Sequence, residues 1–212
     1  MTLRRTSVAI MEHVPVLRFS SAEPSLMGMP NAPEHWTAER VRALPDDGFR
    51  HEVVDGVLLM TPAPSWRHQA VIGAFYVRLR AWLKETRLGH VVFAPADVEL
   101  DAHTLVEPDL FVVPLVQGRK PSAWEETRTL LLVIEVLSPS STRADRHIKL
   151  RRYQRFGVPE YWIVDPDTCV VERWTRDAAL PEVLADCISW QPQAAGPELV
   201  IDLGEVLEEI GG

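Results

Sequence analysis

One polar residue interrupts the most apolar stretch of the sequence. The stretch runs from Leu130 to Leu137, and Glu135 is its only polar residue. A run this apolar, followed by Ser138 and Pro139, predicts a β-strand that is buried on both faces. Burying a carboxylate there without a partner is costly. The charge of Glu135 must therefore be compensated by a metal ion or a buried basic partner, or be avoided by a raised pKa. Each of these is common at active sites.

The rest of the chain is typical of a globular protein. It has 212 residues, of which 46% are hydrophobic and 25% are charged. Residues 1–33 show no hydrophobic periodicity, so we expect a flexible N-terminal arm followed by one domain over residues 34–212. No apolar segment approaches the roughly 20 residues that cross a bilayer, and Met1 to Arg5 lead into no secretory-type segment. We therefore expect a cytoplasmic protein without a membrane partner.

Turn and capping signals predict the order of the elements. Asp55-Gly56 is the strongest short-range signal for a two-residue turn, so an N-terminal β-hairpin is expected over residues 49–54 and 57–61. Ser65 can cap a helix whose apolar residues recur at helical spacing until Gly89. Strands are then expected at residues 90–94, 97–101, 109–113 and 130–137. A basic helix should follow, capped by Ser141 or Thr142 and ending near Phe156. Strands at residues 161–165 and 169–175 come next, and the tail should add an edge strand and a final helix.

A buried strand that is followed by a helix and another strand indicates a crossover connection. The predicted fold class is therefore α/β, with a central mixed β-sheet flanked by helices. Asp109 begins one strand of this sheet, and Glu135 lies near the end of the next. Two carboxylates that meet in this way repel each other, and a divalent cation relieves the repulsion best. Oxygen ligands suit Mg²⁺ or Mn²⁺, so the pair predicts metal-assisted phosphodiester hydrolysis.

A lysine on the following helix is the candidate basic group. Asp145, Lys149 and Tyr153 are spaced four residues apart, so they share one helix stripe. The ammonium of Lys149 could orient an attacking water or stabilise charge on the phosphorane. The alternative is a solvated Asp–Lys pair.

The charge distribution points to one local nucleic-acid surface. The net charge of −8 argues against binding nucleic acid through the whole surface. Residues 143–155 are nonetheless strongly basic, and Arg143, Arg146 and Arg152 are the expected DNA contacts. The alternative is an ordinary solvated face.

Several motifs occur together in this chain. They are His51-Glu52-Val53-Val54-Asp55-Gly56, Pro64-Ser65-Trp66-Arg67-His68-Gln69, Glu107-Pro108-Asp109-Leu110, Ile134-Glu135-Val136-Leu137-Ser138-Pro139-Ser140, and Lys149-Leu150-x-x-Tyr153 with Gly157-Val158-Pro159-Glu160-Tyr161-Trp162. Over roughly residues 35–205 the chain resembles the Uma2 family, a branch of the PD-(D/E)XK restriction-endonuclease-like nucleases. The resemblance implies a restriction-endonuclease-like fold.

The same resemblance implies roles for single residues. Pro108-Asp109 is the "PD", Glu135 is the second acid, and the backbone carbonyl of Val136 is a further metal ligand. The general motif has lysine two residues after the second acid, where this chain has Leu137. The basic role would therefore move to Lys149.

Two further residues are second-tier candidates. Glu52 matches an acidic position of the family and could extend the metal site, or it is a surface carboxylate of the hairpin. His68 lies on the inward face of its helix and could reach the site, or it is a hydrogen-bonded core histidine.

Three functions remain open at this point. The leading one is an Mg²⁺-dependent DNA endonuclease, for which a homodimer is expected because both strands must be cut. The second is a catalytically inactive nuclease-fold module that binds nucleic acid or a protein partner. The third is a metal-free hydrolase that uses the two acids as acid and base.

Overall fold

The structure is a computed structural model, and it describes residues 35–123 and 129–211. The expected N-terminal arm, residues 1–33, lies outside the described residues. None of the helices in the described ranges combines the length and hydropathy that crossing a bilayer requires.

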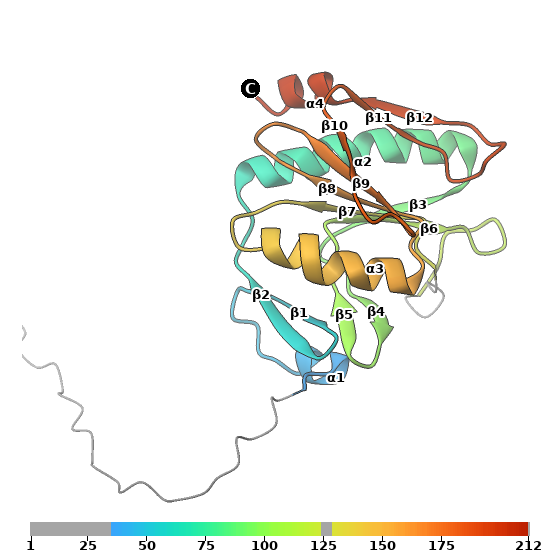
Figure 1. The fold of residues 1–212 in the computed structure, drawn as a ribbon. Helices are drawn as coiled ribbons and strands as arrows, with labels where there is room; N and C mark the ends of the chain where they lie inside the picture. Colours follow the sequence, from blue (N-terminus) through green and yellow to red (C-terminus); the bar gives the residue numbers. More distant parts are fainter. Residues whose placement is uncertain (1–34, 124–128, 212) are drawn as a thin grey trace, which may run out of the picture. The chain divides into compact units, whose positions relative to one another are not determined.

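A six-stranded sheet forms the centre of the fold (Figure 1). Its order is β10-β9-β8-β7-β6-β3. The strands span Gly89–Phe93 (β3), Leu110–Pro114 (β6), Leu132–Val136 (β7), Glu160–Val164 (β8), Val171–Thr175 (β9) and Glu182–Leu184 (β10). β7 and β8 are parallel, and every other neighbouring pair is antiparallel. The predicted mixed sheet in an α/β fold is therefore confirmed.

Helices cover both faces of this sheet. Helix α2 (Trp66–Thr86) lies on one face, and the π-helix η2 (Ala144–Lys149) with α3 (Leu150–Phe156) lies on the other (Figure 1). β7 is buried along its whole length, as its apolar sequence predicted. Ile134 and Val136 pack with α2, whereas Val133 packs with Leu150 and Tyr153 of α3. Because strand side chains alternate, Glu135 faces α3.

Helix α2 begins as the sequence predicted. The hydroxyl of Ser65 accepts a hydrogen bond from the backbone N–H of His68 at 3.2 Å, which is an N-cap. Apolar residues such as Phe75 and Leu79 are fully buried against the sheet. The cap fixes His68 in the first helical turn.

A second sheet of four strands carries the N-terminal hairpin. Its order is β2-β1-β5-β4, with strands at Arg50–Val54 (β1), Val57–Thr61 (β2), Val98–Asp101 (β4) and Thr104–Val106 (β5). Asp55 and Gly56 both have positive φ, 48° and 80°, as a two-residue hairpin turn requires. Helix α1 (Ala38–Arg42), which Thr37 caps, packs on β1 and β5. The hairpin is confirmed, but β5 was not predicted.

Two segments differ from expectation. The helix after β7 starts as a π-helix before α3, which ends at Gly157 with φ 90°. The tail strand β12 (Leu199–Asp202) is not an edge of the central sheet, because it pairs with β11 (Cys187–Trp190) in a sheet of its own. These two strands and the final helix α4 (Leu203–Glu209) add Ile188, Trp190 and Val206 to the core beside α2.

Candidate active site

Asp109 and Glu135 lie side by side. Leu110 pairs with Ile134 between β6 and β7, so the residue before Leu110 lies next to the residue after Ile134. The N–H of Asp109 donates to Oε2 of Glu135 at 3.4 Å, and the N–H of Val136 donates to Oδ2 of Asp109 at 2.9 Å. Both side chains are buried. The structure thus brings the two predicted acids together.

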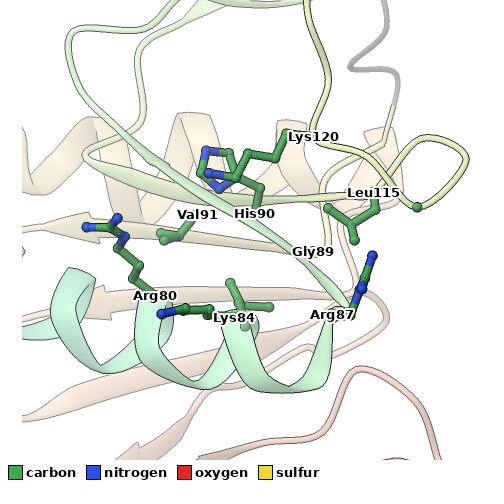
Figure 2. Close-up of a pocket in the computed structure, with 10 residues that line it drawn as sticks. Arg80, Lys84, Arg87, Gly89, His90, Val91, Leu115 and Lys120 are labelled. Atoms are coloured by element: carbon green, nitrogen blue, oxygen red, sulfur yellow. The ribbon is translucent and has the colours of Figure 1, made fainter.

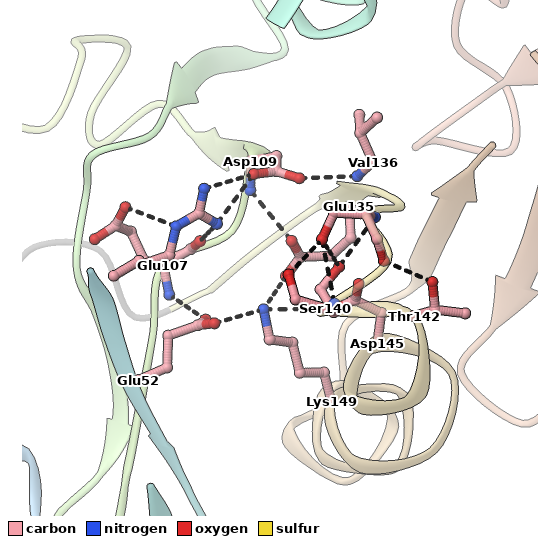
Figure 3. A network of polar contacts seen from close by, with 12 residues as sticks. Glu52, Glu107, Asp109, Glu135, Val136, Ser140, Thr142, Asp145 and Lys149 are labelled. Atoms are coloured by element: carbon pink, nitrogen blue, oxygen red, sulfur yellow. Dashed lines mark hydrogen bonds and ion pairs between the residues drawn. The ribbon is translucent and has the colours of Figure 1, made fainter. Parts of the chain in front are cut away.

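Lys149 is the centre of the buried charges (Figure 3). Its Nζ lies 2.8 Å from Glu52, 3.0 Å from Glu135 and 3.4 Å from Asp145. Lys149 is only 2% exposed, and its three acidic partners are buried as well. The alternative of a solvated Asp–Lys pair is therefore wrong. The lysine comes from η2, where the π-helical turn places Asp145 and Lys149 on the sheet side.

Glu52 is part of the same network. It is 1% exposed, so it is not a surface carboxylate of the hairpin. Its Oε2 contacts Lys149, and its Oε1 accepts a hydrogen bond from the N–H of Glu107 at 2.8 Å. Tyr153, one helical turn after Lys149, donates its hydroxyl to Oε1 of Glu135 at 3.2 Å. The spacing of the helix stripe placed Tyr153 here, although the sequence assigned it no function.

Two basic side chains hold the carboxylate of Asp109. Both terminal nitrogens of Arg50 donate to Oδ1 at 3.0 Å, and Nε2 of His68 lies 3.1 Å from Oδ2. His68 thus reaches the site, and its buried Nδ1 has no hydrogen-bond partner among the described residues. Arg50 was missed by the sequence analysis. The available signal was its spacing, because Arg50 and Glu52 share one face of β1 at positions i and i+2.

The surroundings of Asp109 and Glu135 shift the pKa values of the two carboxyl groups in opposite directions. Burial raises the pKa of Glu135 well above its ordinary value, and the neighbouring carboxylates add to this although Lys149 opposes it. Burial would also raise the pKa of Asp109, but His68, Arg50 and the Val136 N–H outweigh it and lower that pKa. For Lys149, burial favours the neutral amine, yet its acidic neighbours raise its pKa well above normal. Lys149 and Asp109 therefore stay charged, whereas Glu135 holds a proton more readily.

The charge balance of the site suits a divalent cation. Four buried acids, Glu52, Asp109, Glu135 and Asp145, and the partly buried Glu107 surround Lys149 and the partly buried Arg50, which leaves 5 − 2 = 3 negative charges when all are ionised. Within the described residues no three His, Cys, Asp or Glu side chains form a metal-binding cluster. Mg²⁺ commonly binds one or two carboxylates and keeps several waters. Asp109 and Glu135 would supply carboxylate oxygens of the kind that Mg²⁺ or Mn²⁺ binds, once one hydrogen bond to Asp109 is released.

A cavity gives access to these groups. It has a volume of about 460 Å³, and Asp109, Glu135 and Lys149 line it. The other walls come from residues 61–65 before α2, residues 138–141 after β7 and residues 166–167 after β8. The acids are thus buried within the protein and still border a space that can admit part of a substrate.

The expected DNA contacts differ in how free their charges are. Arg146 donates twice to Glu172, at 2.8 and 2.5 Å, and Arg152 pairs with Asp101 and Asp55. Arg143 is exposed, and within the described ranges its side chain has no hydrogen bond or ion pair. Of the three, Arg143 is therefore the one available to a phosphate.

Known proteins resemble this chain in sequence and in fold. Residues 38–204 match the sequence model of the Uma2 family, described as "Putative restriction endonuclease". A solved structure, "a putative nuclease belonging to DUF820 from Anabaena variabilis ATCC 29413", matches with a TM-score of 0.62 at 18% identity, over 82% of this chain and 99% of that one. A comparison with curated proteins found no match. With its restriction-endonuclease-like fold and a family match across most of its length, this chain belongs to the Uma2 family.

Proposed function

We propose that this protein is a metal-dependent DNA endonuclease in which Asp109 and Glu135 bind Mg²⁺ or Mn²⁺ and Lys149 assists. One observation carries the proposal: two buried carboxylates of unequal pKa lie side by side on a cavity, next to a buried lysine. Unequal environments for paired titratable groups are typical of acid–base sites. The family membership and the fold support a nuclease.

The proposed metal site consists of the two side chains and the backbone carbonyl of Val136, a residue that also lines the cavity. A divalent ion bound there would neutralise phosphate charge and lower the pKa of a bound water. Both oxygens of Asp109 already accept hydrogen bonds, from Arg50 on one side and from His68 and Val136 on the other. Ligation by Asp109 therefore requires Arg50 or His68 to release part of the carboxylate.

Lys149 would supply positive charge where the phosphate reacts. Its raised pKa keeps the ammonium protonated, so it can donate to a phosphate oxygen or hold an attacking water. The chain has Leu137 at the usual lysine position, and this side chain is 8% exposed in the core beside α3. The ammonium of Lys149 lies 3.0 Å from Glu135, so a lysine on the following helix takes the place beside the acid that a lysine at position 137 would have.

His68 would act as a positioning residue, whereas Arg50 would compete with the ion for Oδ1 of Asp109. His68 and the backbone N–H of Val136 hold Oδ2 of Asp109 and lower the pKa of this carboxyl group, which helps to keep it ionised at neutral pH. A metal ligand of this kind must be ionised, and its partners fix its orientation.

Cleavage of supercoiled plasmid, linear duplex and single-stranded DNA with Mg²⁺, with Mn²⁺ and with EDTA tests the proposal. We expect cleavage in either metal and none after chelation. Cleavage that survives exhaustive chelation would support the metal-free hydrolase instead. Sedimentation of the same preparation tests the proposed homodimer.

An inactive module that keeps the nuclease fold is the second candidate. The full set of hydrogen bonds on Asp109 favours it, because no lone pair of this carboxylate is free for a metal ion. Calorimetric titration with Mn²⁺ distinguishes the two functions. The endonuclease predicts saturable binding that is lost in Asp109→Asn and in Glu135→Gln. An inert module predicts the same negligible heats for all three proteins.

A further inference from the structure

A second cavity lies at the other end of α2 (Figure 2). Its volume is about 330 Å³, and the charged residues that line it are all basic. They are Arg80, Lys84, Arg87 and Lys120, together with His90. No acidic residue lines this cavity. His68 borders the catalytic cavity, and Lys84 follows 84 − 68 = 16 residues later on the same helix, or about 24 Å along its axis. The basic pocket is thus distinct from the candidate active site.

The local sequence builds the pocket from two directions. Arg80 and Lys84 are spaced i and i+4, so they lie along one side of α2, and Arg87 follows as the C-cap of the helix (Figure 2). Gly89 begins β3 after the short connection Arg87-Leu88, and a Cβ at this position would lie 2.6 Å from the carbonyl oxygen of Val113. The absent side chain lets β3 run close to β6. The floor of the pocket is therefore backbone and apolar side chains.

Lys120 reaches the pocket from a separate loop. A tight turn joins Val116 and Arg119, whose backbone groups bond reciprocally at 2.7 and 3.0 Å. Gln117 and Gly118 occupy this turn with positive φ. The turn places Lys120 on the opposite side of the pocket from Arg80 and Lys84 (Figure 2). A helix C-terminus attracts basic residues of its own last turn, but it gives no reason for a lysine from another loop.

The positive charges of the pocket have no acidic partner among the described residues. Within the described residues, the side chains of Arg80, Lys84, Arg87 and Lys120 form no hydrogen bond and no ion pair. Arg78 of the same helix is paired, since it contacts Glu209 at 2.7 Å, and Arg42 of α1 contacts Glu99 at 2.6 Å. The protein as a whole has a net charge of −8 at pH 7. Within the part of the chain that the structure describes, four cations without an acidic partner therefore surround one cavity.

The electrostatics of His90 agree with this geometry. Partial burial lowers the pKa of His90, and repulsion from Lys120 and Arg80 lowers it further. The imidazole is thus neutral at pH 7 and offers a hydrogen bond without adding repulsion. A bound anion would relieve the repulsion among the remaining cations.

We propose that this basic pocket binds a phosphate group at a site separate from the catalytic centre. Guanidinium groups bind phosphate oxygens through paired hydrogen bonds, and lysines add point charges from the sides. The phosphate would come either from the backbone of a nucleic-acid strand or from a small phosphate compound. The proposal does not depend on cleavage activity, because it concerns charge and geometry at the far end of α2.

Binding measurements in EDTA test this site independently of catalysis. The double variant Arg80→Gln with Lys84→Gln removes two pocket charges from the helix, and Lys120→Gln removes one from the loop without altering the helix. The control Arg42→Gln with Arg176→Gln removes two exposed charges that do not line the pocket. Fluorescence anisotropy with labelled DNA forms one arm, and calorimetry with inorganic phosphate and pyrophosphate forms the other.

We expect wild type to bind in at least one arm, and each pocket variant to lose affinity by about tenfold in that arm, while the control changes by less than about twofold. A loss confined to DNA identifies a strand phosphate, and a loss confined to the small anions identifies a free phosphate compound. Binding in neither arm overturns the proposal. Equal losses in control and pocket variants overturn it as well, because they would reflect net charge alone. Thermal unfolding of every variant verifies that the fold is intact.

Discussion

The backbone N–H of Asp109 donates to the carboxylate of Glu135, while the carboxylate of Asp109 accepts from the N–H that follows Glu135. Each acid is therefore fixed relative to the backbone of the neighbouring strand. The antiparallel register of β6 and β7 sets this arrangement, since Leu110 pairs with Ile134. The separation of the two carboxylates is a property of the sheet, and it does not depend on flexible loops.

Replacing Glu135 by Gln should stabilise the metal-free protein at neutral pH. The folded state binds the Glu135 proton more tightly than the unfolded chain, because burial raises this pKa. Stability is therefore lost as the pH rises from the ordinary carboxyl value through the raised one. A glutamine at this position cannot ionise, so the variant does not lose this stability as the pH rises. Lys149 keeps Glu52 and Asp145 as ion-pair partners.

We expect Glu135→Gln to raise the free energy of unfolding by roughly 1–3 kcal/mol at pH 7 in EDTA. Urea titrations at several pH values measure it, and the difference should vanish below about pH 4, where the wild-type acid is protonated in both states. A variant that is less stable than wild type at pH 7 would show that Glu135 is fully compensated by Lys149.

Replacing Lys149 by Met should strongly destabilise the protein. The variant leaves Glu52, Glu135 and Asp145 buried without their shared cation. Breaking a buried ion pair from one side costs about 3–5 kcal/mol. Adding Glu135→Gln to Lys149→Met should recover part of this loss, because one of the unpaired charges is removed. Unfolding midpoints in urea give both values, and an additive double variant would mean that the two groups do not interact.

Arg50 should compete with the metal ion for Asp109. Its two hydrogen bonds to Oδ1 place a positive charge 3.0 Å from a proposed ligand. Arg50→Gln removes that charge, so the dissociation constant for Mn²⁺ should fall by about tenfold in calorimetric titration. Arg42→Gln is the matched control, since Arg42 pairs with Glu99 on the exposed surface. Equal affinities for wild type and Arg50→Gln would place the ion away from Asp109.

Arg143 and Arg146 should respond differently to substitution. Arg143 is free in the described structure, so Arg143→Gln should weaken DNA binding and reduce the salt slope of log K by about 1. Arg146 is paired with Glu172, so Arg146→Gln should leave that slope unchanged. Anisotropy titrations from 50 to 200 mM salt, roughly the range in which phosphate contacts are resolved, measure both slopes. The opposite pattern would show that the Arg146 ion pair opens on binding DNA.

Local signals in the sequence predicted the elements on which the site depends. Asp55-Gly56 indicated the hairpin, Ser65 indicated the start of α2, and the apolar run around Glu135 indicated the buried strand. β5, β10 and β11 were not predicted, because strands of three or four residues owe their structure to their pairing partners. The π-helical start of the helix after β7 also has no local signature.

Only part of the candidate site was predicted, because only some of its residues have a local signal in the sequence. A lone acid in an apolar run is conspicuous, and a lysine at helical spacing from Asp145 is easily noticed. Arg50 is an ordinary residue in sequence, and only the β1–β5 pairing brings its strand to Asp109. The burial of Asp145 and Lys149 likewise depends on how η2 packs on the sheet. Tertiary contacts therefore decided which charged residues joined the site.

The most direct test of the central claim is the rate of plasmid nicking in Mn²⁺ by wild type, Asp109→Asn, Glu135→Gln and the control Glu209→Gln. Glu209 is an exposed acid that pairs with Arg78, so its variant has the same change of charge outside the site. We predict that the two site variants lose at least about a hundredfold in rate, because each lacks a proposed metal ligand. The control should match wild type. Site variants that nick as fast as the control would contradict the assignment of Asp109 and Glu135.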